Sequence, residues 1–262
     1  MSEADRPPSL SELAALACSE DVNDRAFANG ALRLSSARFP SEVRVAYTQA
    51  RAASLHLHAP TREAVRSGSL RGAALRRLVD GLHDYQVEEL LDVAFPPLDE
   101  TPLPPHHTPY VPSGLREILH ALDLTGLGPS DTFVDLGAGL GKVVMLANLL
   151  TGARAHGVEL DATLVTHARA SVATLGLDGV SFTQGDARDA DLGSGSIFYL
   201  YSPFSGPVLD AVLQRLEAIA WRRALFVCAS PVDTTRFPWL EPLHAPGSWL
   251  VVHRSITSAR LR

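Results

Sequence analysis

The segment Phe133-Val-Asp-Leu-Gly-Ala-Gly-Leu-Gly-Lys142 runs from an apolar stretch into a glycine-rich turn and then into an apolar helical pattern. Gly137, Gly139 and Gly141 lack a Cβ atom, which lets a ligand approach the main chain closely. In open α/β sheets, ligands bind at the carboxyl ends of the strands, where such a turn follows. The segment therefore predicts a ligand site at the end of a strand over residues 132–136.

On both sides of this segment, amphipathic helical patterns alternate with short apolar runs. We expect helices over residues 114–123, 140–150, 162–175 and 207–220, with Ser113 capping the first of them, and strands over 132–136, 156–160, 180–184, 197–201 and 224–229. Residues 239–243 and 249–253 flank Ala245-Pro-Gly-Ser248 and predict a closing hairpin. Strands that alternate with helices imply right-handed crossovers, so the expected fold class is α/β with a doubly wound, mostly parallel sheet.

The first 112 residues follow a different pattern. Residues 1–95 show helical periodicity, with Ser9 or Ser11 as the first N-cap, and predict a helical domain. Residues 96–112 are rich in proline, which excludes a regular helix or a central strand and indicates a strap or linker before the domain of residues 113–262. We expect the helical domain to cap the site and to recognise the substrate through a wall formed by Asp84, Tyr85, Glu88 and Glu89; dimerisation is the alternative.

Composition narrows the classes of function. The net charge of −6 argues against a nucleic-acid partner, and no apolar run approaches the roughly 18 residues of a membrane span. Two distant cysteines exclude a disulfide framework, and the first residues do not resemble a secretion signal. We expect a cytoplasmic protein without a membrane anchor.

Three acidic residues stand at the expected ends of the first three strands. The G-x-G-x-G spacing differs from the dinucleotide pattern G-x-G-x-x-G, and Asp135 beside the turn would repel a pyrophosphate but attract an ammonium group. Glu159 has the position to accept both ribose hydroxyls. Asp186 can accept from an adenine amino group while the Ala187 N–H donates to the ring. Ribose, adenine and a cationic amino-acid group together describe S-adenosylmethionine.

With these residues in place, residues 110–255 resemble the class I S-adenosylmethionine-dependent methyltransferases. The resemblance implies a Rossmann-like, seven-stranded sheet with a reversed last strand. It also implies cofactor contacts from Asp135 and the turn Gly137-Ala-Gly-Leu-Gly141, including Ala138, and from Glu159, Asp186 and Ala187.

A narrower resemblance concerns two further segments. Tyr110-Val-Pro-Ser113 and Phe198-Tyr-Leu-Tyr-Ser-Pro-Phe204 are similar to the non-SET protein-lysine methyltransferases, in which a tyrosine-containing strap covers the methionine end of the cofactor. The resemblance implies that Tyr110 and Ser113 are cofactor contacts. The sequence departs from the Asn/Asp-Pro-Pro-aromatic pattern, because Ser202 replaces the amide or carboxylate that accepts the amine's hydrogen bonds.

Methyl transfer from a sulfonium is an in-line displacement in which the protein mainly aligns the reactants and excludes water. We expect Tyr201, Ser202, Pro203 and Phe204 to face the acceptor, with the rings of Tyr201 and Phe204 forming a slot. Phe198 and Tyr199 are expected to pack on the sheet.

The remaining polar residues receive plainer interpretations. His106 and His107 are expected in solvent, because no Asp, Glu or Cys stands at a metal-ligand spacing from them, and no metal is expected. Lys142 is expected on a helix surface.

The leading hypothesis is methyl transfer to an amino group of a protein or peptide. The alternatives are a small-molecule O- or N-methyltransferase, a cofactor-binding regulator without catalysis, and a nicotinamide oxidoreductase.

Overall fold

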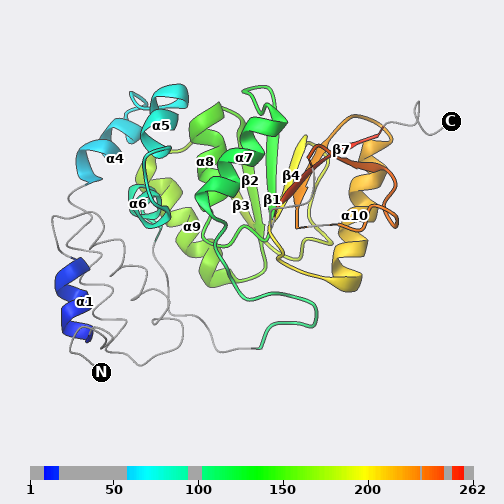
Figure 1. Cartoon of the computed structure of the whole chain (residues 1–262), viewed down its shortest axis with the longest axis horizontal. Coiled ribbons are helices and arrows are strands. Elements are labelled where there is room, and N and C mark those ends of the chain that lie inside the picture. The colour runs from blue at the N-terminus through cyan, green and yellow to red at the C-terminus, as the bar shows by residue number, and fades with distance from the viewer. Residues whose placement is uncertain (1–8, 18–57, 94–101, 231, 245–249, 257–262) are drawn as a thin grey trace.

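A computed structural model describes residues 9–17, 58–93, 102–230, 232–244 and 250–256 (Figure 1). Its centre is a seven-stranded sheet in the order β3-β2-β1-β4-β5-β7-β6. The strands are β1 Thr132–Leu136, β2 Arg154–Glu159, β3 Val180–Gln184, β4 Ile197–Leu200, β5 Phe226–Ala229, β6 Leu240–Pro242 and β7 Val251–Ser255.

The strand directions confirm the predicted α/β fold. Strands β1 to β5 pair in parallel, whereas β7 runs antiparallel to both of its neighbours, β5 and β6. The reversed last strand and the antiparallel pairing of β6 with β7 are therefore as expected, whereas the predicted turn Ala245-Pro-Gly-Ser248 lies outside the described residues. The sheet order changes direction beside β1, which leaves β2 and β4 as its neighbours and opens a crevice at their carboxyl ends.

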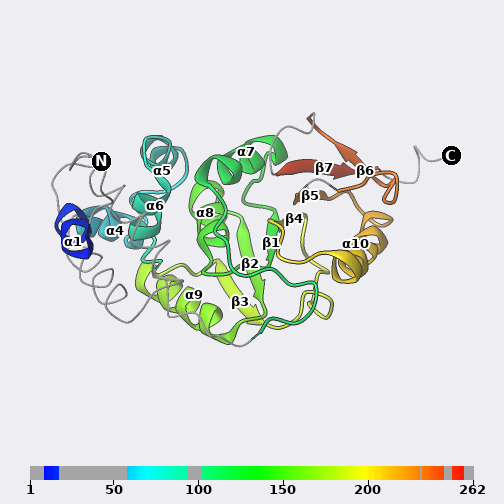
Figure 2. The same ribbon diagram turned by 60° about the horizontal axis from the view of Figure 1, so that its bottom comes forward.

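Helices cover both faces of the sheet (Figure 2). One hydrophobic cluster contains side chains of α7 (Leu115–Thr125), α8 (Lys142–Thr151) and α9 (Ala162–Leu175), and the other contains those of α10 (Gly206–Ala220). Alternate residues of β1 enter different clusters: Phe133 faces α8, and Val134 faces α10. This alternation is what places Asp135 on the α7–α9 face.

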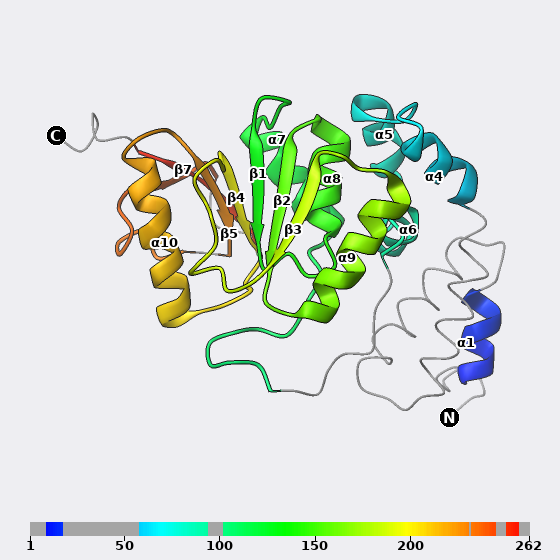
Figure 3. The same ribbon diagram turned by 180° about the vertical axis from the view of Figure 1, so that it is seen from behind.

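The N-terminal helices extend the first cluster (Figures 1 and 3). The described helices are α1 (Leu10–Ala17), α4 (Ala59–Arg66), α5 (Gly72–Val79) and α6 (Asp84–Leu90). Buried side chains of α4, α5 and α6 pack into the same cluster as α8 and α9: Val65, Leu75, Val79, Val87 and Leu90. Among the described residues, none of the helices is both long and apolar enough to cross a bilayer.

Most element boundaries lie close to the expected ones. The starts of α8 and α7 differ from the expectation. Helix α8 begins at Lys142 rather than at Leu140, because Gly141 is its N-cap in the left-handed region with φ 80°. Helix α7 is not capped by Ser113. Gly114 is its N-cap, and the carboxylate of Asp84 accepts the N–H of Leu115 at 2.8 Å.

Two expectations about the N-terminal helices have clear outcomes. Ser9 caps α1, since the Glu12 N–H lies 3.4 Å from Ser9 Oγ and the Glu12 carboxylate accepts the Ser9 N–H at 2.6 Å. The spacing of Leu75, Leu78, Val79 and Leu82 predicts one apolar helix face, but 38% of Leu78 is exposed.

Candidate functional site

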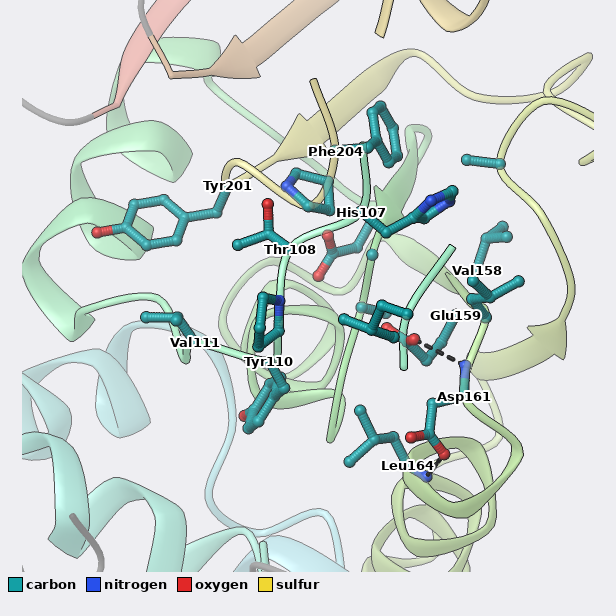
Figure 4. Close-up of a pocket in the computed structure, with 18 of the residues that line it drawn as sticks. His107, Thr108, Tyr110, Val111, Val158, Glu159, Asp161, Leu164, Tyr201 and Phe204 are labelled. Atoms are coloured by element: carbon teal, nitrogen blue, oxygen red, sulfur yellow. Dashed lines mark hydrogen bonds between the residues drawn. The ribbon is translucent and has the colours of Figure 1, made fainter. Parts of the chain in front are cut away.

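A cavity of about 760 Å³ opens at the carboxyl ends of β1 to β4 (Figure 4). Four chain segments that are distant in sequence form its wall: the turn after β1, the end of β2, residues 185–187 after β3, and residues 201–204 after β4. Residues 102–104 and 107–113 cross over it as a strap. The cavity therefore lies where the sheet order changes direction.

Nearly all of the predicted site residues line this cavity. They are Tyr110, Ser113, Asp135, Gly137, Ala138, Glu159, Asp186, Ala187, Tyr201, Ser202, Pro203 and Phe204. Gly139 lies beneath the ring of Tyr110, where a Cβ would collide with that ring. Gly141 does not line the cavity: an added Cβ there would collide with the Phe182 ring, so this glycine allows α8 to pack closely against β3 and α9.

Asp135 is the most deeply buried acid of the site, with 3% of it exposed. Burial, and secondarily the charge of Glu159, raise the pKa of its carboxyl well above the usual range. Among the described residues, this carboxyl forms no hydrogen bond or ion pair. A buried carboxylate is costly without a counter-charge, so the site favours a cationic group beside Asp135.

The carboxylate of Glu159 is held rigidly at the end of β2. It accepts the N–H of Gly139 at 2.8 Å and the N–H of Asp161 at 2.9 Å (Figure 4). Burial raises its pKa, and these backbone bonds oppose that shift because they favour the charged form. The bonds fix the orientation of the group, and its remaining lone pairs are available to a pair of neighbouring hydroxyls.

Asp186 differs from the other two acids because it has a cationic partner. Arg188 Nη2 lies 2.6 Å from its carboxylate, and this interaction lowers the pKa of Asp186. The group is therefore held in its acceptor form beside the buried Ala187. No pattern in the sequence predicted the pairing of Asp186 with Arg188.

Backbone hydrogen bonds attach the strap to the segment after β4. The Thr108 N–H donates to the Pro203 carbonyl at 2.9 Å, and the Ser205 N–H donates to the His106 carbonyl at 2.8 Å. His107 pairs with Phe204 in an antiparallel bridge and lines the cavity (Figure 4). His106 is exposed as expected, but the expectation of solvent exposure is wrong for His107, which is half-buried.

The expected slot between Tyr201 and Phe204 is absent. Tyr201 packs against the cluster on the α7–α9 face, whereas Phe204 is buried in the α10 cluster, and Figure 4 shows the two rings pointing apart. Tyr201 instead stacks on Tyr199, with ring centroids 6.5 Å apart. Phe198 and Tyr199 are fully buried, which confirms that they pack on the sheet.

The surroundings of Tyr201 are acidic. Burial raises the pKa of its hydroxyl, and the negative charges of Glu117 and Asp84 add to the shift. Ser202 turns away from this side: its φ is 53°, and its Oγ contacts the Oγ of Ser230. Tyr201 is thus the part of the motif that lies in an acidic environment.

Lys142 is not on a helix surface, since only 3% of its side chain is exposed. Its Nζ lies 2.8 Å from Asp84 Oδ1 and 3.0 Å from Glu88 Oε1, and it lines the cavity. Glu88 and Glu89 are themselves buried, and Glu89 lies 3.1 Å from His58 Nε2. The predicted acidic wall is therefore largely an internal ion-pair network, and of its carboxylates only Asp84 stays half exposed.

Several lining residues were missed from the sequence. Val158 and Leu164 contribute apolar wall, and Asp161 both caps α9 and donates its N–H to Glu159 (Figure 4). An Asp directly before a helical pattern is a recognisable N-cap signal, so Asp161 was detectable. For Lys142 the signal was its position: it is the only lysine of the chain and directly follows the glycine turn.

Comparisons with known proteins agree with this arrangement. Residues 112–176, which extend from Pro112 through α9, match the model of the family described as histone methylation protein DOT1. A histone-lysine N-methyltransferase, H3 lysine-79 specific, from Cryptococcus neoformans var. neoformans serotype D is 35% identical over 92 residues. The match covers 32% of this chain and only 14% of that protein.

Two solved structures are among those that match. An RNA methyltransferase from Salinibacter ruber in complex with S-adenosyl-L-homocysteine is 28% identical and covers 56% of this chain and 95% of its own, with a TM-score of 0.46. An S-adenosylmethionine-dependent methyltransferase from Aquifex aeolicus is 14% identical and covers 53% and 89%, with a TM-score of 0.45.

The sequence matches confirm the resemblance of this domain to the class I methyltransferases, whose cofactor is S-adenosylmethionine. The family match, over residues 112–176, includes the glycine turn and Glu159 but not the segment after β4.

Proposed function

We propose that this chain transfers a methyl group from S-adenosylmethionine to an amino group of a protein. The observation that carries the proposal is the meeting, in one cavity, of the buried Asp135 carboxylate, the oriented Glu159 carboxylate and the acidic surroundings of Tyr201. The first two suit the cofactor, and the third suits the acceptor.

Three acidic side chains and one backbone N–H of the cavity would hold the cofactor. Asp135 would bind the ammonium group of the methionine end, Glu159 the ribose hydroxyls, and Asp186 with the Ala187 N–H the adenine edge. When bound, the cofactor supplies an activated methyl group on a positively charged sulfur. The strap covers the turn with the Tyr110 ring and thereby keeps water from the reacting groups.

The acidic environment of Tyr201 supports an amine as the acceptor. Glu117 and Asp84 create a negative potential there, which attracts a protonated amine toward the cavity. The amine must lose its proton before it attacks the methyl carbon in line with the departing sulfur. The Tyr201 hydroxyl, which its raised pKa keeps neutral, is an acceptor that can orient the amine.

The similarity to a histone-lysine methyltransferase supports a protein as the carrier of that amine. That similarity covers 32% of this chain and 14% of the relative. The acceptor therefore has to be identified by experiment.

The test is to incubate the purified chain and isotopically labelled S-adenosylmethionine with histone H3, with a protein extract, and with that extract's small-molecule fraction. We expect label on protein lysine, identified by mass spectrometry of peptides. Glu159→Gln should abolish transfer, while Glu241→Gln, at an acid that pairs with Arg254 and does not line the cavity, should leave it intact.

Label found only in the small-molecule fraction would overturn the proposal in favour of a metabolite methyltransferase. Cofactor binding without transfer to any fraction would overturn it in favour of a non-catalytic binding protein.

A further inference from the structure

Lys142 occupies a position that helix preferences do not explain. It is the first residue of α8, where a positive charge is unfavourable because the helix N-terminus carries a partial positive charge. Its side chain is nevertheless almost fully buried between α8 and α6. Its two acidic partners on α6 supply the reason for a cation at this place.

Asp84 connects three elements through one carboxylate. Its Oδ1 atom accepts from Lys142 Nζ and from the N–H of Leu115, both at 2.8 Å. Lys142 directly follows the glycine turn, and Leu115 opens the helix that follows the strap. Asp84 therefore joins the start of α6 to the glycine turn, through Lys142, and to the end of the strap, through Leu115.

Glu88 makes this connection rigid. It lies one helical turn after Asp84, is 5% exposed, and holds Lys142 Nζ at 3.0 Å. Because a buried charge is costly without its partner, α6 cannot move away from α8 while Lys142 stays in place. A shift of α6 must therefore move the first residue of α8 and, with it, the glycine turn.

We propose that Lys142 is a positioning residue that couples the packing of α6 against α8 to cofactor binding. When α6 is packed against α8, the glycine turn and the end of the strap are held in the geometry that binds the cofactor. A bound cofactor in return holds α6 against α8. Such coupling is reciprocal by thermodynamic necessity. The inference rests on the proposed function only in that the chain binds S-adenosyl compounds.

The experiment uses the full chain and S-adenosylhomocysteine, with affinity measured by calorimetry and hydrogen exchange followed in residues 84–90. In the unaltered chain we expect the ligand to slow exchange in α6. Lys142→Met should weaken affinity by about tenfold, within the usual range of coupling energies, and should abolish the ligand-dependent slowing.

Arg76→Met is the matched control. Arg76 on α5 bonds both oxygens of Asp123 on α7, at 2.7 and 2.9 Å, and so also ties the N-terminal helices to the domain. Neither residue lines the cavity. This variant should leave both the affinity and the slowing of α6 exchange unchanged.

A second variant covers the case in which Lys142→Met does not fold, because that change removes a cationic partner of the buried Glu88. Lys142→Met/Glu88→Met replaces both buried charges by apolar side chains, a change that proteins often tolerate. It should bind the ligand with the same weakened affinity and without slowing α6.

If the unaltered chain binds the ligand but the Lys142 variants behave like Arg76→Met, the coupling does not exist. If the unaltered chain fails to bind, the proposed function is wrong instead.

Discussion

At the scale of single residues, Asp135 has the clearest functional signature. It carries a carboxyl group that the fold buries beside Glu159 without a compensating cation, and the pKa of the group is raised accordingly. Such an arrangement lowers the stability of the ligand-free protein at neutral pH. It is retained at functional sites where a ligand supplies the missing charge.

Asp135→Asn should therefore separate stability from binding. Because the folded-state pKa is raised, the favourable contribution of Asp135 is complete below its unfolded pKa and is lost as the pH rises through the folded value. At neutral pH the variant should unfold at a higher temperature, by an amount corresponding to roughly 1 kcal/mol or more. Its affinity for S-adenosylhomocysteine should fall by roughly 1.5–3 kcal/mol, the worth of a bond to a charged group.

Thermal unfolding and calorimetry over a series of pH values measure both effects. Cofactor affinity of the unaltered chain should rise with pH through the raised pKa of Asp135, since only the ionised form attracts the ammonium group. Asp178→Asn, at an exposed acid, is the control. A variant that is destabilised and binds normally would show that Asp135 is a structural group.

At the scale of elements, the sequence predicted those helices and strands whose bounds are determined by a local residue pattern. The bounds of β1, α9 and β3 agree with the expected residues. Strand β1 is a short, mostly apolar run, β3 begins with alternating apolar and polar residues, and α9 is a helical pattern between Asp161 and Gly176. Once these strands are placed, Asp135, Glu159 and Asp186 are predicted at or directly after the strand ends.

The sequence could not show contacts between distant elements. The pairing of Lys142 with α6 joins residues more than fifty positions apart, and the opposite orientations of Tyr201 and Phe204 depend on how the strap attaches after β4. No local pattern reports either feature. The same holds for the cap of α7, which Asp84 supplies from another helix.

The glycine turn gives a prediction at this scale. Gly139→Ala should force the Tyr110 ring away from the turn and should also incur the cost of a left-handed φ of 54°. Gly126→Ala is the matched control, because its φ is 61° but a Cβ there meets no atom within 4 Å. The control should lose only about 1 kcal/mol of unfolding free energy.

Gly139→Ala should lose more stability than the control and should bind S-adenosylhomocysteine much more weakly, as chemical denaturation and calorimetry would show. Adding Tyr110→Ala removes the collision, so the double variant should be more stable than the sum of the two changes predicts. Equal losses at Gly139 and Gly126 would mean that the strap does not lie over the turn.

At the scale of the whole molecule, α4, α5 and α6 share one hydrophobic core with the sheet domain. Side chains of α4, α5 and α6 complete the cluster that covers α8 and α9, and the ion pairs of α6 reach the wall of the cavity (Figure 1). This arrangement agrees with a role near the substrate, which we propose for these helices. The family match, over residues 112–176, begins after them.

The central claim is that this cavity binds S-adenosylmethionine, and titration calorimetry of the purified chain tests it most directly. The account predicts saturable binding of S-adenosylhomocysteine, a large loss of affinity in Glu159→Ala, and no binding of a nicotinamide dinucleotide. Absence of binding, unchanged affinity in Glu159→Ala, or preferential binding of the dinucleotide would contradict it.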